Sequence, residues 1–409
     1  MSTDQGPGKV IFVNRFFYPD HGATAQILSD LASHLTDIGF EVEVVTSRLS
    51  YSNPDERFEP REQWNGVSIV RLPTTGFGRA NLIGRTLDYL SFYVVCFFSI
   101  LKRAKRNDTV IIKTDPPLLS VPIGFVTRLK RARMMNWLQD LFPEVAGALG
   151  MKLARGPAGA FLRALRNRSL RRADLNIAIG ERMAELLREN RVAPERIRVI
   201  QNFSDDDSVR PDPPEWQLLR KAWGYRESDF VIGYSGNLGR AHDVETLLGA
   251  AEILKNQSDI RFLFVGGGHL KQQVETVAET RGLTSIDFKP YQPREKLAQS
   301  LSVPDIHWIS LLPELEGLIV PSKLYGVAAV GRPVLMIGDK DGEIGRLAQR
   351  HGFGVCVGIG ENQHLAEQIL AFARDPKRVE KLGQAARAFI DAEASRKHCF
   401  QQWEDVLKR

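Results

Sequence analysis

A glycine-containing loop with an arginine occurs in the second half of the chain, where the sequence reads YSGNLGR over residues 234–240. It follows an apolar run typical of a strand and precedes a stretch typical of a helix. Gly236 and Gly239 permit a loop that can present backbone N–H groups, and Arg240 adds a guanidinium that can hold two phosphate oxygens. The loop is a candidate phosphate site; an arginine in a solvated turn is the alternative.

Lys323 is a second candidate for phosphate chemistry, in the segment GLIVPSKLYG that begins at Gly317. Pro321 and Ser322 are residue types that commonly begin helices, so Lys323 is expected in the first helical turn. A lysine there opposes the helix dipole and costs stability unless an anion is bound. A diphosphate would remove that conflict, whereas a solvated lysine would not need one.

Two further loops follow predicted strands. Gly22 and Ala23 are small enough for a ligand to approach backbone N–H groups at the start of the next helix. The GxGxxG spacing of NAD-dependent dehydrogenases is absent there. Residues 266–268 are three consecutive glycines, which also fit a loop at the edge of a sheet. Each of these loops fits an ordinary turn as well.

The cysteines do not indicate a metal site or a disulfide framework. The chain has three, Cys96, Cys356 and Cys399, in 409 residues. His398 adjoins Cys399, but no paired Cys-x-x-Cys accompanies them. We therefore predict no structural metal, and a reducing compartment fits this cysteine usage.

The elements that must position these loops alternate between strands and helices. Residues 9–14, 27–38 and 41–47 read as strand, helix and strand, which predicts a parallel sheet. Further strands are expected at 68–73, 109–114, 133–138, 175–179 and 197–202. After an aspartate- and proline-rich break, the strands resume at 230–236, 261–268, 285–291, 305–311, 332–338 and 354–360.

This alternation predicts an α/β protein of two doubly wound, Rossmann-like domains. We place them at residues 1–202 and 217–385, joined by a linker at 203–216. A terminal helix at 386–409 is expected to pack back towards the first domain. Ligands of such domains bind at the carboxyl ends of the strands, so the site is expected in a cleft where the two domains face each other.

The charge is unevenly distributed. The net charge is +6, but residues 102–172 contain 16 Lys and Arg against 4 Asp and Glu. Such an excess suggests an anionic partner: nucleic acid, an anionic lipid surface or a phosphorylated substrate. No helix-turn-helix, zinc finger or stacking platform accompanies it, so we predict no nucleic-acid binding.

The longest apolar run is YLSFYVVCFFSIL, residues 89–101. A helix of that length spans about 20 Å, less than the ~30 Å of a hydrocarbon core. A buried core helix and a helix at the membrane interface both fit, whereas a membrane span does not. No signal peptide is expected, because residues 1–9 are mostly polar or turn-forming and the apolar run at 10–13 is short.

Several motifs together resemble glycosyltransferase family 4, which has the GT-B fold. They are YPDHGATAQ (18–26), WLQDLFPE (137–144), VIQNFSD (199–205), YSGNLGRAHD (234–243), FLFVGGG (262–268), PSKLYGVAAVGRPV (321–334) and GDKDGEIGRL (338–347). The resemblance covers nearly the whole chain. It is strongest to the subgroup that builds bacterial exopolysaccharide or O-antigen units, of the colanic-acid type.

This resemblance implies a retaining, metal-independent enzyme without a cofactor. Such an enzyme transfers a sugar from a nucleotide donor, here a UDP- or GDP-sugar, to a glycan on polyprenyl diphosphate. It would work in the cytoplasm, as a peripheral protein at the inner face of the plasma membrane. The basic block and the apolar helix would then contact that membrane.

The resemblance also implies roles for individual residues. Arg240 and Lys323 would hold the donor diphosphate, and the Gly22-Ala23 turn would face the same phosphates. Tyr291 lies where the nucleobase packs, and Asp140 lies in the segment that meets sugar or acceptor. Asp140 would orient a hydroxyl or act as a base. Gly236, Asn237, Gly317 and Ser322 complete the expected donor-binding set.

Two departures from the family pattern affect these roles. The wider family has two glutamates eight residues apart, which fall on Leu318 and Gly326 when counted back from GRPV. Glu316 can fill the first role, which is catalytic, if the loop is two residues longer, and Glu343 is a candidate for the second, at the ribose. The phosphate-binding arginine of the family falls on Asn237, and its Lys-Gly pair falls on residues 242–243, so Arg240 would be a displaced cation.

Other functions remain open from the sequence. A sugar-nucleotide epimerase of the same fold would use carboxylates around the nucleotide sugar and would need no membrane contact. A non-catalytic subunit that binds nucleotide sugars would account for the missing glutamate. Product analysis without acceptor separates the first from a transferase, and binding without turnover would mark the second.

Overall fold

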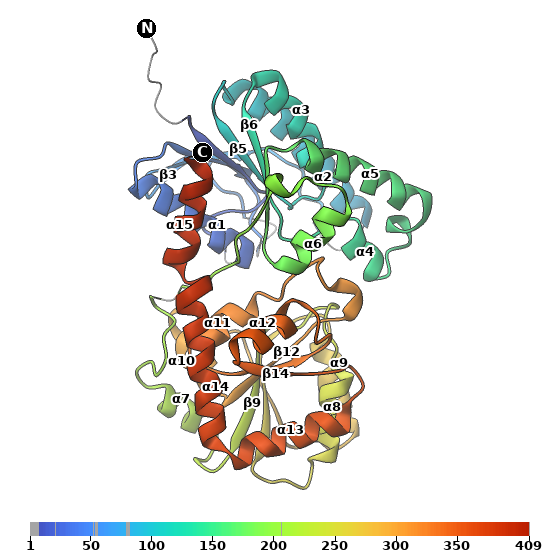
Figure 1. The fold of residues 1–409 in the computed structure, drawn as a ribbon, viewed down its shortest axis with the longest axis vertical. Helices are drawn as coiled ribbons and strands as arrows, with labels where there is room; N and C mark the ends of the chain where they lie inside the picture. Colours follow the sequence, from blue (N-terminus) through green and yellow to red (C-terminus); the bar gives the residue numbers. More distant parts are fainter. Residues whose placement is uncertain are drawn as a thin grey trace. The chain divides into compact units, whose positions relative to one another are not determined.

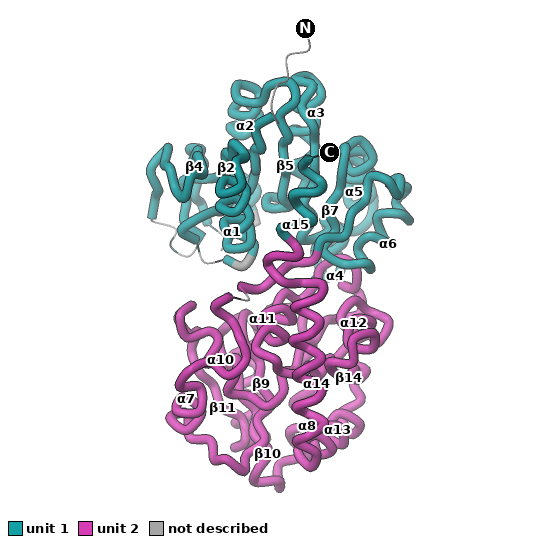
Figure 2. The backbone as a smooth tube through the Cα atoms, turned by 60° about the vertical axis from the view of Figure 1, so that its left-hand side comes forward, with its two compact units in different colours: residues 1–200, 400–409 teal, residues 201–399 magenta. Residues whose placement is uncertain are grey.

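The computed structural model describes residues 8–20, 22–51, 53, 56–78, 82–205 and 207–408. The chain divides into two compact units (Figure 2). Unit 1 comprises residues 1–200 and 400–409, and unit 2 comprises residues 201–399. The end of the chain thus groups with its beginning.

Unit 1 contains an eight-stranded sheet in the order β3-β4-β2-β1-β5-β6-β7-β8. Its strands are β1 (Val10–Val13), β2 (Val42–Ser47), β3 (Arg61–Trp64), β4 (Val67–Leu72), β5 (Thr109–Lys113), β6 (Arg133–Trp137), β7 (Leu175–Ala178) and β8 (Ile197–Val199). All neighbours pair in parallel except β3 and β4. The strand order reverses direction between β1 and β5, so loops that follow these strands lie at a topological switch point.

The strands expected in this half are all present, and β3 was missed. It pairs with β4 across Asn65 and Gly66, both of which have positive φ (47° and 77°). Asn-Gly is the strongest short-range signal for a two-residue hairpin. The signal was present in the sequence, but the polar residues of β3 do not look like a core strand because β3 lies at the sheet edge.

The helices of unit 1 cover both faces of the sheet (Figure 1). They are α1 (Ala23–Asp37), α2 (Leu82–Arg103), α3 (Ser120–Lys130), α4 (Glu144–Ala148), α5 (Gly156–Arg172), α6 (Glu181–Glu189) and the end of α15 (Arg396–Leu407). Alternate residues of β1 separate the two cores. Ile11 and Val13 join α2 and α3 in one cluster, whereas Phe12 lies near Trp137, which in turn packs on Trp403 of α15 at 4.6 Å.

Helix α15 is fixed to unit 1 by more than Trp403. The Phe400 ring stacks on His34 of α1 with ring centres 4.4 Å apart, and His34 Nε2 lies 3.0 Å from Glu404 Oε1. Arg133 Nη1 donates to the carbonyl oxygen of Val406 at 2.8 Å. These contacts explain why residues 400–409 group with a sheet whose strands lie between residues 10 and 199.

Helix α2 is longer than the apolar run that predicts it, with 22 residues. The expected length was therefore wrong: residues 83–103 are long and apolar enough to span a membrane by length and composition. Phe92, Cys96 and Ile100 are nevertheless fully buried against the sheet, as in a core helix. The opposite face carries exposed apolar side chains, at Ile83, Leu87, Leu90, Val94 and Phe98.

Unit 2 contains a six-stranded, wholly parallel sheet in the order β11-β10-β9-β12-β13-β14. Its strands are β9 (Phe230–Asn237), β10 (Ile260–Gly267), β11 (Ile286–Lys289), β12 (Ile306–Ser310), β13 (Val334–Ile337) and β14 (Gly354–Val357). This is the doubly wound order 3-2-1-4-5-6, with its switch point between β9 and β12. All six strands were expected from the sequence.

The helices of unit 2 are α7 (Trp216–Ala222), α8 (Glu245–Ile253), α9 (Lys271–Thr280), α10 (Leu297–Ser302), α11 (Lys323–Ala329), α12 (Glu343–His351), α13 (Asn362–Arg374) and α14 (Pro376–Phe389). The main core lies between the sheet and α8, α9 and α13. A π-helical turn, Ile390–Ala394, separates α14 from α15. Helix α11 begins at Lys323, which confirms the expected position of that lysine in the first turn.

Candidate functional site

The candidate donor residues of unit 2 gather at the switch point of its sheet. Gly236 and Asn237 end β9, His242 lies in the loop that follows, and the loop after β12 leads to Lys323. The two loops are tied together, because Ser310 at the end of β12 donates its hydroxyl to the carbonyl oxygen of Asp243 at 2.9 Å. The carboxyl ends of parallel strands meet at this edge, where doubly wound sheets bind ligands.

Gly236 and Lys323 are in close contact. A Cβ added at Gly236 would lie 3.0 Å from Lys323 Cε, and Gly236 has a φ of +125°. A side chain at this position would therefore strain the backbone and displace the lysine. The sequence predicted both residues as donor-binding, and the fold brings them together from segments more than 80 residues apart.

The Lys323 ammonium group lies between two ring systems. Its Nζ is 3.2 Å from His242 Nε2 and 5.1 Å from the centre of the Tyr234 ring. Burial lowers the pKa of Lys323 to about 8, so the side chain is mainly charged at neutral pH. Among the residues that the structure describes, no carboxylate forms an ion pair with it.

His242 accepts from Lys323 as a neutral imidazole. His242 Nδ1 lies 2.6 Å from the carbonyl oxygen of Ser310, which can only accept, so Nδ1 carries the proton. Nε2 then offers its lone pair to Lys323. Burial, followed by the nearby Lys323 charge, lowers the pKa of His242 to about 4. Lys323 is thus held by a partner that leaves its positive charge uncompensated.

Tyr291 lies over the glycines that end β10. A Cβ added at Gly266 would lie 3.1 Å from one edge carbon of the Tyr291 ring, and one at Gly267 would lie 3.2 Å from another. The ring is therefore in contact with the loop backbone, and the side chain is 60% exposed. An exposed aromatic ring fixed against a glycine loop can stack on a planar ligand.

Glu316 and Glu343 are buried next to each other. The Glu316 carboxylate accepts a hydrogen bond from the backbone nitrogen of Glu343, at 3.0 Å, at the start of α12. A carboxylate at a helix N-terminus is stabilised by the free N–H groups and the dipole. Glu316 therefore has a structural contact of its own, and its catalytic role stays a prediction, as does the ribose contact of Glu343.

The remaining donor candidates lie around this group. Arg240 and Asn237 are exposed, and Arg240 has no side-chain hydrogen bond or ion pair with any described residue. Gly317 takes a φ of +74° beside Glu316, and Ser322 is exposed just before α11. Gly326 lies within α11, where an added Cβ would be 3.3 Å from Leu301 Cδ1. A side chain at the position of the missing second glutamate would therefore face an apolar neighbour.

Gly22, Ala23 and Asp140 belong to unit 1. Gly22 precedes α1, and a Cβ added to it would meet no atom within 4 Å. The backbone there is open on that side, as a ligand-facing turn requires. Ala23 is the first residue of α1. Lys113, the last residue of β5, donates from Nζ to the carbonyl oxygen of Thr24 at 3.1 Å and so holds this turn.

Asp140 follows β6 and lines a small cavity of about 30 Å³ together with Lys113, Asn136 and Arg166. Burial raises the pKa of Asp140 to about 6, although a hydrogen bond with Thr114 partly opposes this increase. Its Oδ1 atom is buried without a hydrogen-bond partner among the described residues. Asp140 can therefore change its protonation state near neutral pH, as a general base would.

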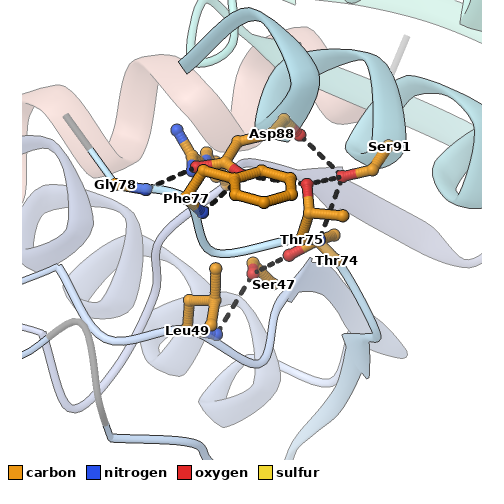
Figure 3. A network of polar contacts seen from close by, with 9 residues as sticks. Ser47, Leu49, Thr74, Thr75, Phe77, Gly78, Asp88 and Ser91 are labelled. Carbon is orange, nitrogen blue, oxygen red and sulfur yellow. Dashed lines mark hydrogen bonds and ion pairs between the residues drawn. The ribbon is translucent and has the colours of Figure 1, made fainter. Parts of the chain in front are cut away.

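A polar network at the same edge of unit 1 fixes the loop after β4 to α2 (Figure 3). Asp88 of α2 accepts from Thr75 Oγ1 at 2.8 Å and from the backbone nitrogens of Phe77 at 3.0 Å and Gly78 at 3.1 Å. Arg15, which follows β1, pairs with Asp88 at 3.5 Å. The charges of Arg15 and Asp88 therefore compensate each other within the fold.

Family comparisons cover both units. Residues 22–202 match the glycosyl transferase 4-like domain, and residues 217–389 match the glycosyl transferases of group 1. The chain belongs to glycosyltransferase family 4. The resemblance stated from the sequence motifs is thereby confirmed.

Two relatives of this glycosyltransferase come from bacteria. It is 24% identical over 412 residues to a protein of *Escherichia coli* K12 named as the colanic acid biosynthesis glycosyl transferase WcaI, covering 98% of this chain and 100% of that one. It is 27% identical over 290 residues to a *Pseudomonas aeruginosa* protein named as glycosyltransferase WbjE, covering 68% and 70% of the two chains.

Solved structures similar to the glycosyltransferase cover its full length. Sucrose-phosphate synthase from *Thermosynechococcus elongatus* has a TM-score of 0.76 at 15% identity, covering 98% of both chains. *Anabaena* HepE, solved with UDP, has a TM-score of 0.73 at 15% identity, covering 98% and 99%. At this identity the likeness concerns the fold alone, and it confirms the predicted GT-B class.

Three residues of the glycosyltransferase were not among the candidates predicted from the sequence: Tyr234, His242 and Lys113. His242 lies in the motif YSGNLGRAHD, so its position in the loop was visible, but its contact with Lys323 depends on a separate loop. Lys113 looks like an ordinary strand residue in the sequence. Among the described residues, no group of three or more His, Cys, Asp or Glu side chains lies close enough to hold a metal.

Proposed function

We propose that this glycosyltransferase is a retaining enzyme of bacterial surface polysaccharide synthesis. It would move a sugar from a UDP- or GDP-sugar to a glycan carried on polyprenyl diphosphate. The name of the WcaI relative refers to colanic acid biosynthesis, and the HepE structures were solved with UDP, with UDP and glucose, and with UDP-glucose. The observation that carries the proposal is the uncompensated charge of Lys323 at the switch point of unit 2.

The diphosphate of the donor would bind at Lys323. Its oxygens would accept hydrogen bonds from the Lys323 ammonium group, whose partner His242 is neutral. The exposed guanidinium of Arg240 would add a second positive charge. The Tyr291 ring would pack on the nucleobase. Gly236 would allow the phosphates to approach the backbone beside Lys323.

Catalysis would come from stabilising the leaving group. The bond between the sugar C1 and the phosphate oxygen breaks, and its electron pair goes to the diphosphate. Cations fixed in a partly dry site stabilise that developing charge more than water does. The acceptor hydroxyl would attack C1 on the face that the diphosphate leaves, and its proton would pass to a phosphate oxygen of the leaving group.

Asp140 would serve the acceptor. Because its pKa is near 6, it would be mainly ionised at neutral pH and able to orient the acceptor hydroxyl while the proton of that hydroxyl passes to the leaving phosphate. Neither a metal nor another cofactor is part of the proposal. Glu316 would act through the loop it holds, in which Gly317 and Ser322 lead to Lys323.

Unit 1 would meet the membrane through the exposed face of α2. Its apolar side chains recur at helical spacing and are followed by Lys102 and Arg103. An apolar stripe flanked by basic residues is typical of helices that lie in a membrane interface. The enzyme would therefore be cytoplasmic and peripheral, at the face where a lipid-linked acceptor is presented.

Titration calorimetry with UDP, GDP and ADP tests the donor site. We expect saturable binding of one of them and its loss in Lys323→Ala, with retained binding in the matched control Lys255→Ala. Failure of all three nucleotides to bind would contradict the proposed donor site. Product analysis with and without lipid-linked acceptor follows, and release of an epimerised sugar nucleotide without acceptor would favour the epimerase.

A further inference from the structure

A groove of about 720 Å³ lies between α3 and α5 of unit 1. Its lining includes Phe125 and Arg128 from α3, and Leu165, Arg168 and Arg172 from α5. We call it the α3–α5 groove. Its volume falls within the range of sites that bind small molecules, about 300–1,000 Å³. The residues given roles in glycosyl transfer do not line it.

The floor and one wall of the groove are apolar. Phe125 is 64% exposed, and its ring stacks on Phe97 of α2 with ring centres 6.3 Å apart. Leu165 is half-buried on the facing helix, and Met134 of β6 lies beneath. A large aromatic side chain left in water at the mouth of a groove indicates a site that an apolar group covers.

Three arginines surround this apolar surface without partners. Arg128, Arg168 and Arg172 are all exposed, and no side-chain hydrogen bond or ion pair joins them to a residue that the structure describes. Elsewhere in unit 1, Arg103 and Arg166 pair with Glu43 and Glu144.

One acid, Asp174, lines the same groove. Its Oδ2 accepts from the backbone nitrogen of Met134 at 2.7 Å, and its charge also acts on Arg133. The three arginines outnumber it, so the groove has an excess of positive charge beside an apolar wall.

The surroundings of the groove are apolar as well. Helix α3 packs against both α2 and α5. Exposed side chains on these three helices include Phe98, Leu129 and Phe161. An inorganic anion at the arginines would leave the apolar lining of the groove, including Phe125, in water, whereas an amphiphile would cover it.

We propose that the α3–α5 groove binds one acidic phospholipid of the membrane. The headgroup phosphate is held by Arg128, Arg168 and Arg172, and the beginning of an acyl chain lies on Phe125 and Leu165. This ligand is not the sugar acceptor. The proposal extends the proposed membrane contact of α2 by a defined lipid site, and it does not require glycosyl transfer.

The test uses the full chain and two sets of probes. The first set is vesicles of phosphatidylcholine with and without phosphatidylglycerol. The second set is soluble and monomeric: dihexanoyl phosphatidylglycerol, dihexanoyl phosphatidylcholine and inorganic phosphate. The variant is Arg128→Ala with Arg168→Ala and Arg172→Ala. A charge-matched control removes three exposed basic residues of unit 2: Lys255→Ala, Arg350→Ala and Lys377→Ala.

We expect saturable binding of dihexanoyl phosphatidylglycerol to the wild type and the control. A basic residue near an anionic surface contributes about fivefold in affinity, so the triple groove variant should bind the acidic vesicles about a hundredfold more weakly. Leu165→Trp, which fills the groove and keeps every charge, should also lose the soluble lipid. Thermal unfolding and UDP binding should be unchanged in both, which separates this site from the donor site.

Several results would overturn the proposal. Equal vesicle binding by the groove variant and the control would show that net charge alone attracts the membrane. Inorganic phosphate bound as tightly as the acidic lipid would indicate a simple anion site. Equal affinity for dihexanoyl phosphatidylcholine would show that the arginines do not select an acidic lipid. Binding of polyprenyl phosphate in the groove without binding of phosphatidylglycerol would make this the acceptor site.

Discussion

Each unit contains a lysine that burial has made less basic, and the two lysines have different partners. Lys113 of unit 1 donates to the carbonyl oxygen of Thr24, lies 3.7 Å from the centre of the Trp137 ring, and has a pKa of about 7. Lys323 of unit 2 faces neutral His242 and keeps a pKa of about 8. Burial is the main cause of both shifts.

We propose that the difference in surroundings distinguishes a structural lysine, Lys113, from a ligand-binding lysine, Lys323. Lys113 is 2% exposed and holds the first turn of α1, so its partner is permanent. Lys323 is less buried, and its neutral partner leaves the charge uncompensated at a switch point. A buried cation with no anion nearby is costly, and an incoming diphosphate would offset that cost.

Lys323→Ala should give the largest effect. It removes the cation expected to stabilise the leaving diphosphate, so kcat/KM should fall about a thousandfold, or about 4 kcal/mol. Steady-state kinetics measures this, with Lys323→Arg as the control that keeps the charge. A loss confined to unfolding temperature, with unchanged kcat/KM, would place Lys323 with Lys113 as a structural lysine.

Asp140→Asn should come next, with kcat reduced about a hundredfold and donor affinity unchanged. Because the raised pKa of Asp140 is about 6, wild-type kcat should fall as pH drops through 6, when the carboxylate becomes protonated. The variant should lose this acid limb. Turnover equal to wild type across the whole pH range would remove Asp140 from the mechanism.

Lys113→Met should change stability rather than donor binding. The folded pKa of about 7 lies below the ordinary 10.5, so the unfolded chain binds more protons between these values. The free energy of unfolding of the wild type should therefore increase as pH rises from 7 to 10, by an amount of the order of 1–4 kcal/mol. Methionine keeps the packing on Trp137 and should remove this contribution.

Denaturant unfolding across that pH range measures the change in Lys113→Met, and UDP titration gives the control. Binding of UDP should be largely retained, because the cations proposed to hold its phosphates, Lys323 and Arg240, lie in unit 2. An unchanged pH dependence of unfolding would show that Lys113 is not the titrating group.

His242→Leu should have the smallest effect, about tenfold in donor affinity, equivalent to about 1.4 kcal/mol. Leucine fills the space but offers no lone pair to Lys323. His242→Gln is the informative comparison, because its amide can accept from Lys323 and donate to the carbonyl oxygen of Ser310. Recovery of affinity in the glutamine variant would support a positioning role. Equal losses in both variants would argue against it.

Much of the fold could be predicted from the sequence because its signals are local. Apolar runs such as 230–236, followed by glycine loops and amphipathic stretches, predicted every strand of unit 2. Pro321 and Ser322 predicted the start of α11 correctly. The edge strand β3 was missed because its residues are polar, although its Asn65-Gly66 turn was a sufficient signal.

Partners of individual side chains were decided by the tertiary structure. Residue types and spacing determined the α/β alternation, the candidate phosphate-binding loops and the family, since these depend on periodicity, turn chemistry and motif. The contact of Lys323 with His242, that of Glu316 with the start of α12, and the Trp137–Trp403 packing join segments distant in sequence. Such contacts depend on strand order and on which loops meet at one edge, because burial and pKa are properties of the folded surroundings and not of the residue alone.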